Sequence, residues 1–129
     1  MNSYIKLLAT LLLVSFLGCA SANNTNNKSS NEDKANSTIR VTNLHNYIKS
    51  IPRLTFTGGE VINTAVNTFT GNKYPLYVLD GVQIGTSYAE LVSLLDRNQY
   101  VTVEFLKISK ATVQYGEAGK NGVIVITTG

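Results

Sequence analysis

The sequence predicts a small α+β domain, in which a mixed β-sheet carries two helices. Three observations support this fold class. Short apolar strand patterns bounded by Gly, Pro or Asp-Gly recur after residue 38. Two segments between them have the i, i+3, i+4 spacing of amphipathic helices. The last apolar run, Val123–Ile126, is apolar on both faces, which is typical of a strand in the middle of a sheet.

The domain is expected to begin with a strand and a helix. Ile39 and Val41 alternate with polar neighbours, which predicts a short first strand. Asn43 is a candidate N-cap for a helix through Ser50, and Pro52 would end that helix. The apolar face of the helix would consist of Leu44, Tyr47, Ile48 and Ile51.

Two weaker strand patterns follow. They cover Leu54–Thr57 and Val61–Thr68, and the Gly58-Gly59 pair between them predicts a turn. Their Asn and Thr content indicates an edge of the sheet or a partly exposed loop.

The pattern becomes sharper from Pro75, which is tolerated as the first residue of a strand. The apolar run Leu76–Leu79 follows and ends at Asp80-Gly81. Asp-Gly between apolar segments is the preferred type I′ hairpin turn, so Val82–Ile84 is expected to pair back on Leu76–Leu79.

A second helix and a long strand come next. Ser87 and Glu90 form a capping box for a helix that would continue to about Arg97. Its apolar face would consist of Leu91, Leu94 and Leu95. Tyr100–Leu106 alternates apolar and polar residues, which predicts a strand with one solvated face.

Three glycines precede the last strand. Gly116, Gly119 and Gly122 cannot form a phosphate-binding loop, because such a loop follows a strand and opens a helix. They instead predict tight turns with positive φ that direct the chain into the strand.

The C-terminal half carries five sequence landmarks in order. They are PLYVLDGV at Pro75–Val82, a short acidic linker or helix, a hydrophobic-Leu-Lys strand end, an Ala-Thr and Tyr-Gly pair, and NGVIVITT at Asn121–Thr128. This order resembles the plug domain of TonB-dependent outer-membrane receptors, especially the starch-utilisation (SusC/RagA) type. The resemblance implies a plug-like fold for residues 38–129. The structural motif residues that it implies are Pro75, Asp80, Gly81, Tyr115, Gly116, Asn121 and Gly122.

The chain also departs from the family pattern. Ile108 stands where the family usually has Asp, and Asn67–Tyr74 replaces an Arg-Gly strand. A plug normally lies inside a barrel, and a barrel of about 22 strands with roughly 9–11 residues each needs over 200 residues. With 129 residues, this chain is not expected to transport by itself. The segment Ile39–Thr42 is similar to a TonB-contacting box, an alternative to its interpretation as the first strand.

The N-terminus predicts a lipoprotein signal peptide over residues 1–18. Leu7–Leu17 is apolar but too short for a membrane span of about 20 residues. Phe16-Leu17-Gly18-Cys19 resembles a bacterial lipobox, which would place a lipid anchor on Cys19. The alternative is cleavage after the A-x-A site that ends at Ala22, which would discard Cys19 and release a soluble protein. Residues 19–37, rich in Asn and Ser, are expected to form a disordered tether.

The residues offer little for catalysis. Cys19 is the single cysteine and His45 the single histidine, so no disulfide within the chain and no Cys- or His-based metal cluster is expected. His45 would lie on the helix surface, and Asp80 is explained by its turn. Charged residues are scattered, which argues against nucleic-acid binding. No enzyme activity and no cofactor are expected.

Three functional hypotheses follow. The first is a plug-like binding or assembly module, anchored to the outer membrane through Cys19, that docks onto a TonB-dependent barrel receptor or another envelope protein. The second is a soluble or surface-exposed ligand-binding protein, which a signal cleaved after Ala22 would secrete to the periplasm. The third is a truncated receptor remnant.

Overall fold

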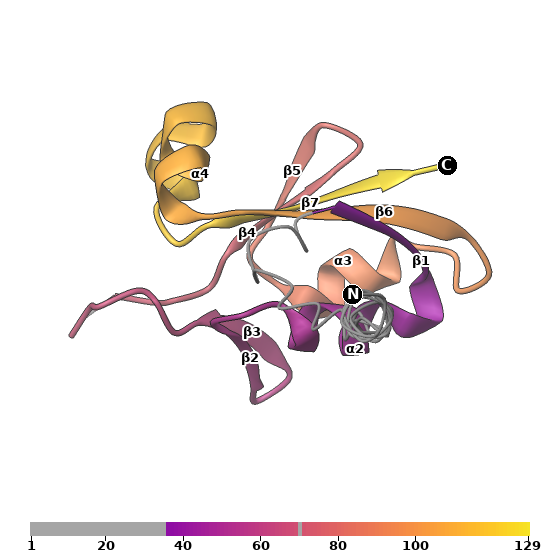
Figure 1. Ribbon diagram of the computed structural model, residues 1–129, viewed down its shortest axis with the longest axis horizontal. Helices are drawn as coiled ribbons and strands as arrows, with labels where there is room; N and C mark the ends of the chain where they lie inside the picture. The colour runs from indigo at the N-terminus through magenta and orange to yellow at the C-terminus, as the bar shows by residue number, and fades with distance from the viewer. Residues whose placement is uncertain (1–35, 70) are drawn as a thin grey trace, which may run out of the picture.

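The computed structural model describes residues 36–69 and 71–129. The predicted signal peptide, the lipobox at Cys19 and nearly all of the predicted tether lie outside the described residues. The described part confirms the α+β class: a five-stranded mixed sheet with the strand order β1-β6-β7-β4-β5 lies beside a separate two-stranded sheet, β2-β3 (Figure 1).

The strands are β1 (Asn36–Arg40), β2 (Leu54–Thr57), β3 (Glu60–Asn63), β4 (Leu76–Leu79), β5 (Val82–Gly85), β6 (Tyr100–Leu106) and β7 (Val123–Thr128). The helices are η1 (Val41–Asn43), α2 (Leu44–Ser50), α3 (Tyr88–Ser93), α4 (Ile108–Tyr115) and η2 (Gly116–Gly119), of which η1 and η2 are 3-10 helices.

Strand β7 lies at the centre of the five-stranded sheet, as predicted. It pairs with β4 in parallel and with β6 antiparallel. Strand β1 pairs with β6, and β5 pairs with β4 through a hairpin, so β1 and β5 form the two edges. Val123, Ile124 and Ile126 are fully buried, which agrees with a strand covered on both faces.

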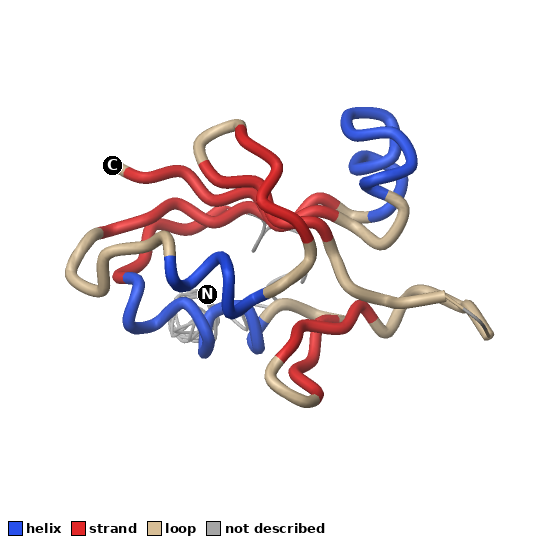
Figure 2. The backbone as a smooth tube through the Cα atoms, turned by 180° about the vertical axis from the view of Figure 1, so that it is seen from behind, coloured by secondary structure: helices blue, strands red, loops and turns tan. Residues whose placement is uncertain are grey.

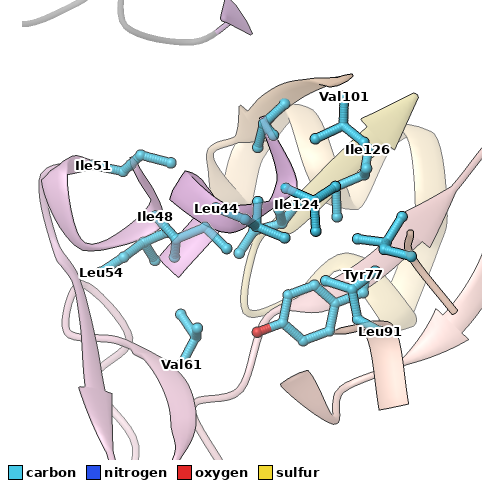
Figure 3. Packing of buried hydrophobic residues seen from close by; sticks show 13 residues of the cluster. Leu44, Ile48, Ile51, Leu54, Val61, Tyr77, Leu91, Val101, Ile124 and Ile126 are labelled. Atoms are coloured by element: carbon cyan, nitrogen blue, oxygen red, sulfur yellow. The ribbon is translucent and has the colours of Figure 1, made fainter. Parts of the chain in front are cut away.

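The two faces of the sheet are covered differently (Figures 1 and 2). Helices α2 and α3 lie on one face, where the larger core cluster forms (Figure 3). Helix α4 lies over one end of the other face, where Ala111 packs in a smaller cluster. Each fully buried aliphatic side chain contributes about 1.5–3 kcal/mol to stability. The larger cluster includes Leu44, Ile48, Val61, Tyr77, Leu91, Val101, Ile124 and Ile126, and the smaller includes Leu76, Val78, Leu106 and Val123.

The beginning of the domain differs in detail from the prediction. Strand β1 begins at Asn36, inside the range assigned to the tether, and Val41 belongs to η1 rather than to the strand. Asn43 occupies the N-cap position of α2 without a side-chain cap hydrogen bond. The physical reason is that η1 already gives Asn43 helical φ and ψ angles of −98° and −1°, whereas a capping residue is extended. Ile39 pairs with Val101, as the first-strand interpretation of this segment predicts.

Strand β3 is shorter than the predicted range Val61–Thr68. It ends at Asn63, whose backbone N–H donates to Lys73 O and whose Oδ1 accepts from Ala65 N. An Asn side chain that bonds the backbone two residues later turns the chain away from a strand. The Gly58-Gly59 turn is confirmed, with φ angles of 62° and 88°.

Helix α3 is also shorter than predicted, because it ends at Ser93 rather than near Arg97. The N–H groups of Leu94 and Leu95 bond carbonyls three residues back, which tightens the last turn and ends the helix. Leu95 is buried, but Leu94 is 55% exposed and does not belong to the apolar face. The Ser87 cap is confirmed, because Ser87 Oγ accepts from Glu90 N.

Helix α4 is a third α-helix, which the sequence did not predict. Ile108, Ala111 and Tyr115 have the i, i+3, i+7 spacing of one helix face and are buried or half-buried, whereas Val113 is 89% exposed. The helix lacks a side-chain cap at Lys107, so the usual start signal is missing.

Candidate functional site

The motif residues of the C-terminal half gather at the two ends of the parallel pair β4–β7. Because parallel strands run in one direction, the residues before both strands meet at one end and the residues after them meet at the other. Leu76 N donates to Gly122 O at 3.0 Å, and Asp80 N donates to Ile126 O at 2.9 Å. Pro75 is buried at the first end.

Asp80 joins the ends of β4 and β7. Asp80 and Gly81 have φ angles of 48° and 83°, which confirms the predicted type I′ turn. In addition, Asp80 Oδ1 accepts from Thr128 N at 2.8 Å, and Oδ2 accepts from Thr128 Oγ1 at 2.8 Å. The local sequence predicts the turn but not this second contact, since Thr128 lies 48 residues away.

Asn121 connects three segments at the other end of the pair. Its Nδ2 donates to Asn72 O at 3.1 Å, Asn72 Oδ1 at 2.9 Å and Tyr74 O at 3.1 Å. Its carbonyl accepts from Asn63 Nδ2 at 2.8 Å. Both Asn63 and Asn121 are buried, so these bonds satisfy groups that water does not reach. The sequence predicted Asn121 as a motif residue but did not single out Asn63, whose partner is 58 residues away.

The glycines before β7 are required for different reasons. Gly122 has φ 89°, as predicted, and a Cβ there would lie 2.9 Å from Phe105 Cε2 and 3.2 Å from Leu106 O. Gly116 has φ 60°, also as predicted. The prediction of positive φ is wrong for Gly119, where the reason is space: a Cβ would collide with the backbone carbonyl of Ala111.

Tyr115 packs on the side of the β4–β7 pair that α4 covers. Its side chain is half-buried against the smaller core cluster, and its hydroxyl accepts from Gln114 Nε2 at 3.3 Å. This motif residue therefore contributes packing.

An aromatic cluster lies where α2, β2, α3 and β4 meet. The ring of His45 is exposed, as predicted, and stacks on Phe56 at a centroid distance of 3.9 Å. Tyr88 meets Phe56 edge-on at 5.0 Å, and the Tyr77 ring lies 6.2 Å from the Tyr88 ring. Burial raises the pKa of the Tyr77 hydroxyl well above its usual value, and nearby Glu60 and Tyr88 raise it further. Within residues 36–69 and 71–129, no three His, Cys, Asp or Glu side chains are grouped to hold a metal ion.

Comparison with known proteins relates part of this chain to a receptor. No protein-family model matches the chain. The chain is 36% identical over 62 residues to TonB-dependent receptor P26 of Formosa agariphila. A region of this chain is therefore related to a TonB-dependent receptor. The match covers 48% of this chain and spans about 6% of the length of the receptor. In the part of the chain that the structure describes, no helix combines the length and apolar character needed to cross a membrane.

Proposed function

We propose that this chain is a non-enzymatic lipoprotein of the outer membrane whose plug-like domain is a binding or assembly module for another envelope protein. The partner would be a TonB-dependent barrel receptor or a component that works with one, which would link the module to TonB-dependent nutrient uptake. The observation that carries the proposal is the 62-residue relation to a TonB-dependent receptor.

The roles of the motif residues support a binding module rather than an enzyme. Asp80 accepts a hydrogen bond from Thr128 N, and Asn121 donates one to Tyr74 O in the segment before β4. Gly122 leaves room for the Phe105 ring, which a Cβ would contact. Asp80 and Asn121 thus use their side chains to join segments of the fold. Apolar side chains for a protein contact are available elsewhere, on edge strand β5 at Val82 and on α4 at Val113.

The lipid anchor is the first part of the proposal to test. If Cys19 is acylated, wild-type protein takes up radioactive fatty acid and fractionates with membranes, because two or more acyl chains provide stable attachment. The Cys19→Ala protein should take up no label and leave the membrane fraction. Unlabelled, soluble wild-type protein would instead indicate cleavage after Ala22 and a secreted periplasmic protein.

The docking partner is tested separately. A photoreactive residue placed at Val113, which is 89% exposed, is expected to cross-link in intact cells to an outer-membrane barrel receptor identified by mass spectrometry. A matched variant with the photoreactive residue at Glu117, on η2, tests how far the contact extends. Cross-links only to unrelated soluble proteins, or none from either position or from Val82, would contradict the proposed assembly role.

A further inference from the structure

Tyr77 lies between the five-stranded sheet and the β2–β3 hairpin. Its side chain is 0% exposed, and its hydroxyl has no hydrogen-bond partner among the described residues. Figure 3 shows this hydroxyl pointing toward Val61 of β3. A buried hydroxyl without a partner costs free energy, and water restores that free energy when it reaches the group. The Tyr77 hydroxyl therefore lies at the contact between hairpin and sheet without a protein partner among the described residues.

The hairpin is attached to the rest of the domain by a small set of side chains. Its two strands pair with each other and not with the five-stranded sheet. Leu54 and Val61 are its buried aliphatic side chains, and Phe56 contacts the rings of His45 and Tyr88.

Two polar side chains complete the attachment. Glu60 accepts from Ser87 Oγ at 3.2 Å and from Tyr88 N at 2.7 Å, which joins the hairpin to the start of α3. Asn63 donates to Asn121 O at 2.8 Å. Hydrogen bonds of this kind contribute modestly to stability because water replaces them on opening.

The connections at both ends of the hairpin permit movement. Arg53, just before β2, has φ 70°, a left-handed conformation that is strained for a residue other than glycine. Between β3 and β4, residues 64–69 and 71–75 contain no helix or strand, and opening there must break the hydrogen bond from Asn63 N to Lys73 O. The hairpin can thus move away without breaking a strand pair of the main sheet.

We infer that the β2–β3 hairpin opens as a local unit, favoured by hydration of the Tyr77 hydroxyl and by relief of the strained backbone at Arg53. The five-stranded sheet stays folded during this opening. The open form uncovers Tyr77, Leu54 and Val61, and so presents an apolar surface beside β4 that the closed form hides. The proposed opening of the hairpin does not depend on which partner the domain binds.

Hydrogen exchange on the full chain tests the inference. Backbone amides of Leu54–Thr57 and Glu60–Asn63 are expected to exchange much faster than hydrogen-bonded amides of β6 and β7, as local opening requires. Equal protection of the hairpin and of β7 would overturn the inference, because both would then open only by global unfolding.

Tyr77→Phe tests the role of the hydroxyl. The change removes the unpaired group and keeps the ring, so exchange of the hairpin amides should slow roughly fivefold or more. Tyr115→Phe is the matched control on α4, and it should leave hairpin exchange unchanged. Faster hairpin exchange in Tyr77→Phe would show that the hydroxyl makes a stabilising bond and would overturn the inference.

Glu60→Ala provides a second, independent variant. Loss of the side chain that accepts from Tyr88 N and Ser87 Oγ should speed hairpin exchange roughly tenfold while the amides of β7 keep their protection. Equal acceleration of hairpin and β7 exchange would contradict a local opening.

Discussion

The β4–β7 pair and the β2–β3 hairpin each depend on a glycine with nearly the same φ angle, but the two glycines are required for different reasons. Gly122, before β7, has φ 89° and a Cβ would meet Phe105 and Leu106. Gly59, in the hairpin turn, has φ 88° and open space around the position of a Cβ. The pair is buried on both faces and joined at both ends, whereas the hairpin pairs only with itself. Gly122 is therefore required both for its backbone angle and for close packing, whereas Gly59 is required for its backbone angle alone.

Substitution of these two glycines should give the largest difference. Gly122→Ala combines backbone strain with a collision and should lower the free energy of unfolding by about 3 kcal/mol or more. Gly59→Ala has the backbone strain alone and should cost about 1–2 kcal/mol. Urea denaturation of both variants measures the difference. Equal losses would show that packing around Gly122 relaxes and that the two regions are alike.

Removal of the Asn121 amide should have the next largest effect. Asn121→Ala leaves Tyr74 O and the Asn72 acceptors without their donor and should cost about 2 kcal/mol. Asn72→Ala is the matched control, because both backbone carbonyls keep their bonds, and it should cost under about 1 kcal/mol. Thermal unfolding of the two variants side by side measures this, and a larger shift for Asn72→Ala would contradict the assigned role.

The pH dependence of stability should report on Tyr77. Burial raises the pKa of its hydroxyl above the ordinary value of 10.0, so the folded state keeps the proton that the unfolded state releases. This difference in pKa stabilises the folded state fully below pH 10. The stabilisation is lost as the pH rises above 10, by about 1.4 kcal/mol per pH unit. Urea denaturation between pH 8 and pH 11 should show a smaller decline for Tyr77→Phe. Identical declines in both proteins would mean that the hydroxyl ionises in the folded state.

Local patterns predicted much of the fold correctly. The alternation of Tyr100–Leu106, the Asp80-Gly81 turn and the Ser87 cap each depend on neighbouring residues, and all three are present. Prediction failed at the end of β3, where Asn63 bonds both the nearby Ala65 N and the more distant Lys73 O. It also failed at α4, whose start at Lys107 has no side-chain cap.

The residues of the candidate site were likewise predictable where they follow a local pattern, and their long-range contacts were not. Motif positions such as Gly122 were predictable, because a glycine at a strand entry indicates positive φ. The bonds from Asp80 to Thr128 and from Asn63 to Asn121 join residues 48 and 58 positions apart, and no local pattern encodes them. The unpaired Tyr77 hydroxyl also depends on the surrounding elements, although the tyrosine itself lies in the Pro75–Val82 landmark.

The central claim is that this plug-like domain folds on its own core and can act as a module. Calorimetry of residues 36–129, purified without a partner, tests it most directly. The account predicts one cooperative transition whose calorimetric and van't Hoff enthalpies agree, as they do for small domains that fold independently. The absence of a cooperative transition would contradict it and show that folding requires another protein.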